Sequence, residues 1–117
     1  MLSVRAIFDY YKKHGHETIV MGASFRSVGE VLALAGCDRL TISPALLEKM
    51  DGMTDAVPLK LDAAAAKTKD IPAVEMSEAI FRWQMNSDAM ATEKLADGIR
   101  KFAADTEKLE EIVKSKM

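Results

Sequence analysis

Two short strand-like segments set between helical patterns constrain the fold more than any other feature of this chain. Residues 18–22 (TIVMG) are apolar without alternation, which is typical of a strand covered on both faces, and residues 39–42 (RLTI) are the second predicted strand. Helical patterns surround them: one that ends at Gly15, one over 27–35 and one over 44–50. This order, with short joins, predicts an α/β fold with parallel strands and right-handed crossovers.

The predicted helices begin at residues that are suited to capping. Ser3 precedes the first apolar stripe and is expected to cap that helix. Ser27 and Glu30 have the spacing of a capping box. Ser43 followed by Pro44 fits an N-cap and a first helical position, so it predicts the start of the third helix.

A sheet of only two parallel strands is incomplete. Each strand would leave a bare hydrogen-bonding edge, and such a pair is not stable by itself. We therefore expect the missing strands to come from sequence outside these 117 residues or from another chain. The whole chain is therefore expected to be one partial domain.

The second half of the chain has a different character. Residues 51–76 contain a glycine, two prolines and an alanine run, which predicts a long connection with about one helical turn. Residues 77–117 predict helices with a break at 86–88. The last helix carries an apolar stripe, formed by Leu95, Ile99, Phe102, Leu109, Ile112 and Val113. We expect this stripe to pack on the chain's own domain, and a coiled-coil partner is the alternative.

Charge and cysteine content argue against several classes of partner. The chain has 16 Lys and Arg against 18 Asp and Glu, so no basic surplus favours nucleic acid or an anionic membrane. No apolar run approaches the roughly 20 residues that span a bilayer. Cys37 is the single cysteine, which fits a reducing, cytoplasmic setting and a buried, inert thiol.

Residues 21–26 (MGASFR) combine a strand end, a polar tip and a helix start. Ser24 offers a hydroxyl, and Arg26 offers a planar guanidinium that can bind two phosphate oxygens at once. The backbone N–H groups of a following helix would add to an anion site. This order predicts phosphate binding, and the alternative is a plain turn with a solvated arginine.

Other residues that could carry chemistry have plainer interpretations. His14 and His16 could supply two metal ligands, but no third ligand lies near them in sequence, so we predict a solvated helix end and no metal site. Asp38 and Asp62 have no evident acid–base partner and are expected at the surface. Trp83 is expected in a packed core rather than in a ligand cage.

Several long motifs, in order along the chain, resemble the C-terminal third of transaldolase, a family of class I aldolase-type barrels. The resemblance runs nearly from end to end and is weakest over residues 51–76. The motifs are YYKKHG at 10–15, VMGASFR at 20–26, LAGCDRLTISP at 34–44, FRWQ at 81–84, DAMA at 88–91 and KLADGIRKFA at 94–103.

The resemblance implies the C-terminal portion of a TIM (β/α)8 barrel, with 18–22 and 39–42 as strands seven and eight and a helical C-terminal extension. Transaldolases transfer a dihydroxyacetone unit from sedoheptulose 7-phosphate to glyceraldehyde 3-phosphate in the pentose phosphate pathway. They do so through a Schiff base on a barrel lysine, without a metal or organic cofactor. The residues that match the family's phosphate site are Ser24 and Arg26, and Phe25 between them is expected to shape the pocket wall.

The family's Schiff-base lysine and its acid–base carboxylates belong to earlier strands, so we expect no catalytic residue in this chain. Our leading hypothesis is a transaldolase in which this chain supplies the sugar-phosphate-binding part. The alternative is a non-catalytic phosphate-binding or interaction module. Phosphorylated sugars and the remainder of the barrel are the expected partners, and a homodimer is left open.

Overall fold

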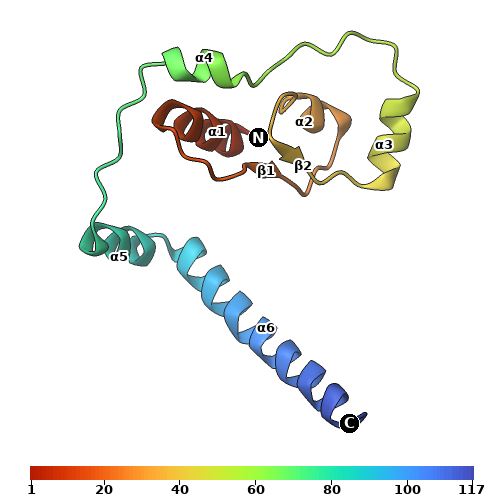
Figure 1. The fold of residues 1–117 in the computed structure, drawn as a ribbon, viewed down its shortest axis with the longest axis vertical. Helices are drawn as coiled ribbons and strands as arrows, with labels where there is room; N and C mark the ends of the chain where they lie inside the picture. Colours follow the sequence, from red (N-terminus) through yellow and green to blue (C-terminus); the bar gives the residue numbers. More distant parts are fainter. The chain divides into compact units, whose positions relative to one another are not determined.

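The computed structural model describes residues 1–117, which cluster into two compact units, Met1–Ala73 (unit 1) and Val74–Met117 (unit 2). Unit 1 contains both strands and four helices, and unit 2 contains two helices (Figure 1). The elements of unit 1 are α1 (Leu2–His14), β1 (Met21–Gly22), α2 (Val28–Leu32), β2 (Arg39–Leu40), α3 (Pro44–Asp51) and α4 (Ala63–Thr68).

The two strands are parallel neighbours, as the alternation of helices and strands predicted. Met21 lies opposite Arg39, and Gly22 lies opposite Leu40. Both strands are shorter than predicted: β1 begins at Met21 rather than at residue 18, and β2 ends at Leu40 rather than at residue 42. The backbone turns soon after Gly22, where Ser24 has a φ of 59°. The expectation that the first strand is covered on both faces is wrong within this chain, since Met21 is 60% exposed.

Helix α2 is shorter than the predicted range of 27–35. It ends at Leu32, and the next residues form tight turns in which Leu34 N–H bonds to the Val31 carbonyl and Ala35 N–H to the Leu32 carbonyl. These turns end at Gly36, whose φ of +100° few other residues adopt without strain. The sequence pattern missed this because its apolar spacing continues through the turns.

The core of unit 1 lies between α1, the strands and the segment that leads to α4. Its buried side chains come from four separate parts of the chain, namely Phe8, Val20, Leu34 and Leu61. Phe25 is partly buried and packs against them. The core therefore depends on contacts between residues far apart in sequence. Phe25, in the loop that follows β1, takes part in these contacts.

The connection predicted over 51–76 contains more structure than one isolated turn. Asp62 lies at the surface, as expected, and caps α4 by accepting the N–H of Ala64 at 2.7 Å. Helix α4 contacts α1 (Figure 1). Beyond α4, Lys69 forms an ion pair of 2.6 Å with Asp9, which is buried on α1. The burial of Leu61 in the core and the ion pair between Lys69 and Asp9 hold the connection against α1.

Unit 2 consists of α5 (Glu78–Ser87) and α6 (Ala89–Lys114), which are separated by a break at Asp88, as predicted. Asp88 accepts the N–H of Ala91 at 2.9 Å and so begins α6. Neither helix contains a buried residue, and Trp83 is 70% exposed, so unit 2 by itself does not supply the core expected around this side chain. The apolar stripe of α6 is exposed as well.

None of the helices combines the length and the apolar character that crossing a membrane requires.

Candidate phosphate-binding loop

The loop that follows β1 carries the three residues predicted for the phosphate site. Gly22 is the last strand residue, and a Cβ there would lie only 2.9 Å from a methyl group of Leu34 and 3.1 Å from the ring of Phe25. A Cβ at this position would therefore crowd the Leu34 and Phe25 side chains where they pack over the end of the strand. This contact anchors the middle of the loop on the core.

The two polar residues flank that anchor and face outward. Ser24 and Arg26 are exposed, whereas Phe25 between them is partly buried. Neither the Ser24 hydroxyl nor the Arg26 guanidinium forms a hydrogen bond or ion pair within the chain. Both groups are thus available as donors at the carboxyl end of a parallel strand, the edge at which α/β proteins bind ligands.

The backbone of the loop is held by the start of α2. Ser27 accepts the N–H of Glu30 at 3.3 Å, which is half of the predicted capping box. The Glu30 carboxylate does not return to the N–H of Ser27, but accepts the N–H of Arg26 at 2.7 Å. The i, i+3 spacing predicted the first contact, and it gave no signal for the second, which spans four residues.

The contribution expected from the helix N-terminus is small. Helix α2 has five residues, too few to align a large dipole. The Arg26 N–H is also already bonded to Glu30. The charge available to an anion in this loop therefore comes chiefly from the Arg26 guanidinium, with the Ser24 hydroxyl as a second donor.

An ionic contact supports the opposite end of the strands. Lys12 on α1 pairs with Asp38 at 2.8 Å, and Asp38 also accepts the N–H of Val20 at 2.9 Å. Burial alone would raise the pKa of Asp38, but the hydrogen bonds from Lys12 and Val20, with the charges of Lys12 and Arg39, hold that pKa below its ordinary value. The expected surface role of Asp38 is wrong: it ties α1 to the start of both strands.

The remaining residues that we considered for chemistry have structural roles in unit 1. His14 lies at the end of α1, and its Nε2 is 3.0 Å from the Ile71 carbonyl oxygen, so it is not simply solvated. Cys37 is only partly buried, and its thiol donates to the Val20 carbonyl at 3.3 Å. Neither residue lies in the loop after β1.

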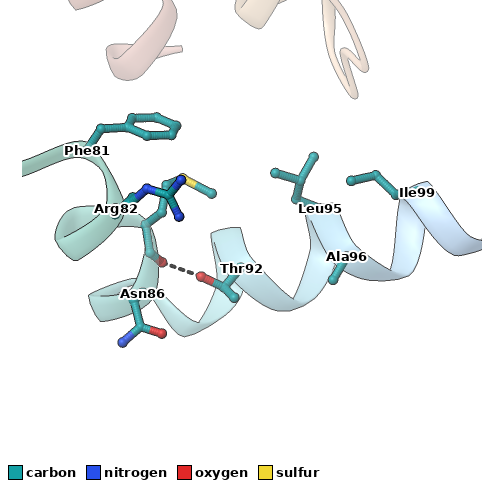
Figure 2. Close-up of a pocket in the computed structure, with 8 residues that line it drawn as sticks. Phe81, Arg82, Asn86, Thr92, Leu95, Ala96 and Ile99 are labelled. Atoms are coloured by element: carbon teal, nitrogen blue, oxygen red, sulfur yellow. Dashed lines mark hydrogen bonds between the residues drawn. The ribbon is translucent and has the colours of Figure 1, made fainter. Parts of the chain in front are cut away.

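Unit 2 contains a groove of about 410 Å³ between its two helices (Figure 2). Leu95 and Ile99 project from the same side of α6, and Phe81 extends from α5 (Figure 2). The one charged side chain in the lining, Arg82, is paired with Glu78 at 2.8 Å. An apolar groove with its arginine neutralised does not suit a sugar phosphate, so it is distinct in chemistry from the loop after β1.

The comparisons with known proteins agree on one family. The family model for transaldolase/fructose-6-phosphate aldolase matches residues 1–113. The chain belongs to the transaldolase/fructose-6-phosphate aldolase family. The geometry of the loop after β1 does not by itself identify a family, and the match to the family model does.

The chain is also similar to individual transaldolases, among them those of Edwardsiella ictaluri, Alteromonas mediterranea and Pseudoalteromonas atlantica. It is 60% identical to the first over 113 residues, 57% identical to the second over 118 residues and 57% identical to the third over 113 residues. These matches cover 97%, 100% and 97% of this chain, but only 35%, 36% and 35% of the relatives. The chain thus spans about a third of the length of the curated relatives that it matches.

Proposed function

We propose that this chain is the sugar-phosphate-binding part of a transaldolase. The reaction is the transfer of a dihydroxyacetone unit from sedoheptulose 7-phosphate to glyceraldehyde 3-phosphate, in the pentose phosphate pathway and the cytoplasm. Family membership supports the reaction class. The observation that carries the proposal is the loop after β1, in which Phe25 packs inward while Ser24 and an unpaired Arg26 face out.

The same proposal makes β1 and β2 two neighbouring strands of a (β/α)8 barrel, the seventh and eighth by resemblance. Their parallel pairing is what such a barrel requires. Ile19 and Met21, which are more than half exposed here, would face the interior or the next layer of the closed barrel. The remaining strands would come from further sequence or from another chain, and a homodimer stays a prediction.

In this proposal the chain binds substrate but does not form the imine. A phosphate group carries close to two negative charges at neutral pH and three acceptor oxygens. Arg26 would bind two of these oxygens with its guanidinium, and Ser24 would donate to a third. The Schiff-base lysine is expected outside the chain. In keeping with this, Lys12 and Lys69 are held in ion pairs and neither strand contains a lysine.

A chimaera tests the proposal. The segment of the Edwardsiella ictaluri transaldolase that matches this chain over 113 residues would be replaced by the chain itself. We expect the chimaera to be an active transaldolase, since the replaced and inserted segments are 60% identical. An inactive but folded chimaera would contradict the proposed function.

Arg26→Ala in the chimaera tests the phosphate site. Loss of a charge-assisted contact worth about 2–3 kcal/mol should lower kcat/KM for glyceraldehyde 3-phosphate by about 30- to 150-fold. The value for unphosphorylated glyceraldehyde should change less than about twofold. Arg100→Ala, which removes an exposed arginine from α6, is the matched control and should change neither. Equal losses for both acceptors would refute the role of Arg26.

A further inference from the structure

The contact between Glu30 and Arg26 joins the phosphate loop to a helix. The Glu30 carboxylate accepts the backbone N–H of Arg26 at 2.7 Å. Glu30 is the third residue of α2 and is partly buried, whereas Arg26 precedes the helix and is exposed. The helix thus supplies the fixed partner, and the loop residue is the one that is held.

The carboxylate binds the backbone of Arg26 and leaves its guanidinium alone. No ion pair forms between the two side chains, although an arginine and a glutamate four residues apart could readily make one. Such a pair would neutralise the guanidinium and occupy its donors. In the observed arrangement Glu30 restrains Arg26 without using the group that would contact an anion.

The loop needs such a restraint because its backbone adopts an unfavourable conformation at Ser24. Ser24 has a φ of 59°, in the left-handed region that disfavours residues other than glycine. Two contacts hold the loop on the far side of Ser24: the Phe25 ring packed over Gly22, and the hydrogen bond from Arg26 to Glu30. Without the second contact, the residue that carries the guanidinium would be free to turn.

We infer that Glu30 is the positioning residue of the phosphate-binding loop: it fixes the backbone of Arg26 so that the guanidinium meets the substrate phosphate. This inference rests on the proposed function. An ionised carboxylate has no donor and repels phosphate, so Glu30 is not itself a ligand. Its effect is on binding, through the preorganisation of Arg26.

The test uses Glu30→Ala in the chimaera, with inorganic phosphate as a competitive inhibitor. We expect the inhibition constant of phosphate and the KM for glyceraldehyde 3-phosphate to rise about five- to tenfold, with kcat within about twofold of the parent. The KM and kcat for unphosphorylated glyceraldehyde should not change. Glu30→Gln keeps an oxygen that accepts the Arg26 N–H, so it should restore phosphate inhibition to the parent value or a stronger one.

Ser27→Ala is the matched control, because it removes the other capping contact of α2 and leaves the Arg26 N–H bonded to Glu30. It should lower stability without changing phosphate inhibition. The inference is overturned if Glu30→Ala leaves the inhibition constant of phosphate unchanged, or if the Glu30→Ala variant fails to fold. It is also overturned if Glu30→Gln binds phosphate as weakly as Glu30→Ala does, or if Ser27→Ala raises the inhibition constant by as much as Glu30→Ala. If Arg26→Ala leaves phosphate inhibition unchanged, the proposed function fails instead.

Discussion

The two units of this chain are stabilised in different ways. Unit 1 buries large side chains almost completely, among them Phe8, Leu34 and Leu61. Unit 2 buries none, although α6 alone has 26 residues and an apolar stripe. Unit 1 therefore has a core made from its own residues, whereas the apolar side chains of unit 2 are not covered by its own two helices.

The ion pairs show the same contrast. In unit 1 the pairs Lys12–Asp38 and Lys69–Asp9 join residues 26 and 60 positions apart. In unit 2 every ion pair joins residues three or four positions apart on one helix, as Lys101 and Asp97 do. Contacts of the first kind fix a tertiary structure, and contacts of the second kind support a helix wherever it lies. The loop that we propose for phosphate lies in the unit with tertiary contacts.

Of these variants, Gly36→Ala should lower the stability of unit 1 the most. A Cβ at this position would lie 2.0 Å from the Leu61 carbonyl oxygen, and the φ of +100° adds backbone strain. We expect the chimaera to lose about 3–4 kcal/mol of stability, measured by urea unfolding. Gly15→Ala is the matched control, because its φ is +72° but nothing lies within 4 Å of the added Cβ, so about 1–2 kcal/mol should be lost. Equal losses would mean that the segment at Leu61 does not cross Gly36 closely.

Asp38→Asn tests the long-range ion pair and should have an intermediate effect. Asparagine keeps an acceptor for the Val20 N–H but loses the charge opposite Lys12, so about 1–2 kcal/mol of stability should be lost at neutral pH. Because the folded-state pKa of Asp38 is lowered, its carboxylate stabilises the fold above the unfolded pKa near 4, and this is lost as pH falls through the folded pKa. The thermal midpoints of parent and variant should therefore converge below about pH 4.

Asp97→Asn is the counterpart of that variant in unit 2. Its partner Lys101 lies one turn away on an exposed helix face, so its loss should cost less than about 0.5 kcal/mol. A cost equal to that of Asp38→Asn would remove the distinction between long-range and local ion pairs on which the comparison rests.

Helix caps should cost about the same in both units, because a cap acts locally. Ser27→Ala in unit 1 and Asp88→Ala in unit 2 each remove a side chain that accepts a backbone N–H at the start of a helix. Each should lower stability by about 1 kcal/mol, as urea unfolding of the chimaera would report. A much larger cost at Asp88 would show that the break between α5 and α6 has a role beyond capping.

The features that sequence predicted best are those with local causes. Ser27 caps α2 as predicted, the break between α5 and α6 falls within the predicted range 86–88, and the alternation of helices and strands predicted the parallel pair of β1 and β2. The contact between α4 and α1 and the partners of Asp38 were missed because they depend on residues distant in sequence. The two helices of unit 2 do not by themselves supply the core expected around Trp83.

For the loop after β1, sequence predicted candidate residues but not the contacts that hold them. The order of strand, polar tip and helix start predicted Ser24 and Arg26, and the resemblance to the family predicted the same positions. The hydrogen bond from Arg26 to Glu30 and the packing of Phe25 over Gly22 required coordinates, because no spacing rule predicts either contact. Binding of phosphate by Ser24 and Arg26 stays a prediction until it is measured.

The most direct test is the crystal structure of the chimaera after borohydride reduction in the presence of fructose 6-phosphate. Reduction converts the imine into a stable bond, so the structure would show both the attached lysine and the position of the phosphate. We predict a phosphate within hydrogen-bonding distance of Ser24 and Arg26, and a covalent bond to a lysine outside the segment that this chain supplies. A phosphate bound elsewhere, or attachment to a lysine of this chain, would contradict the proposal that the chain binds the substrate while other residues perform the chemistry.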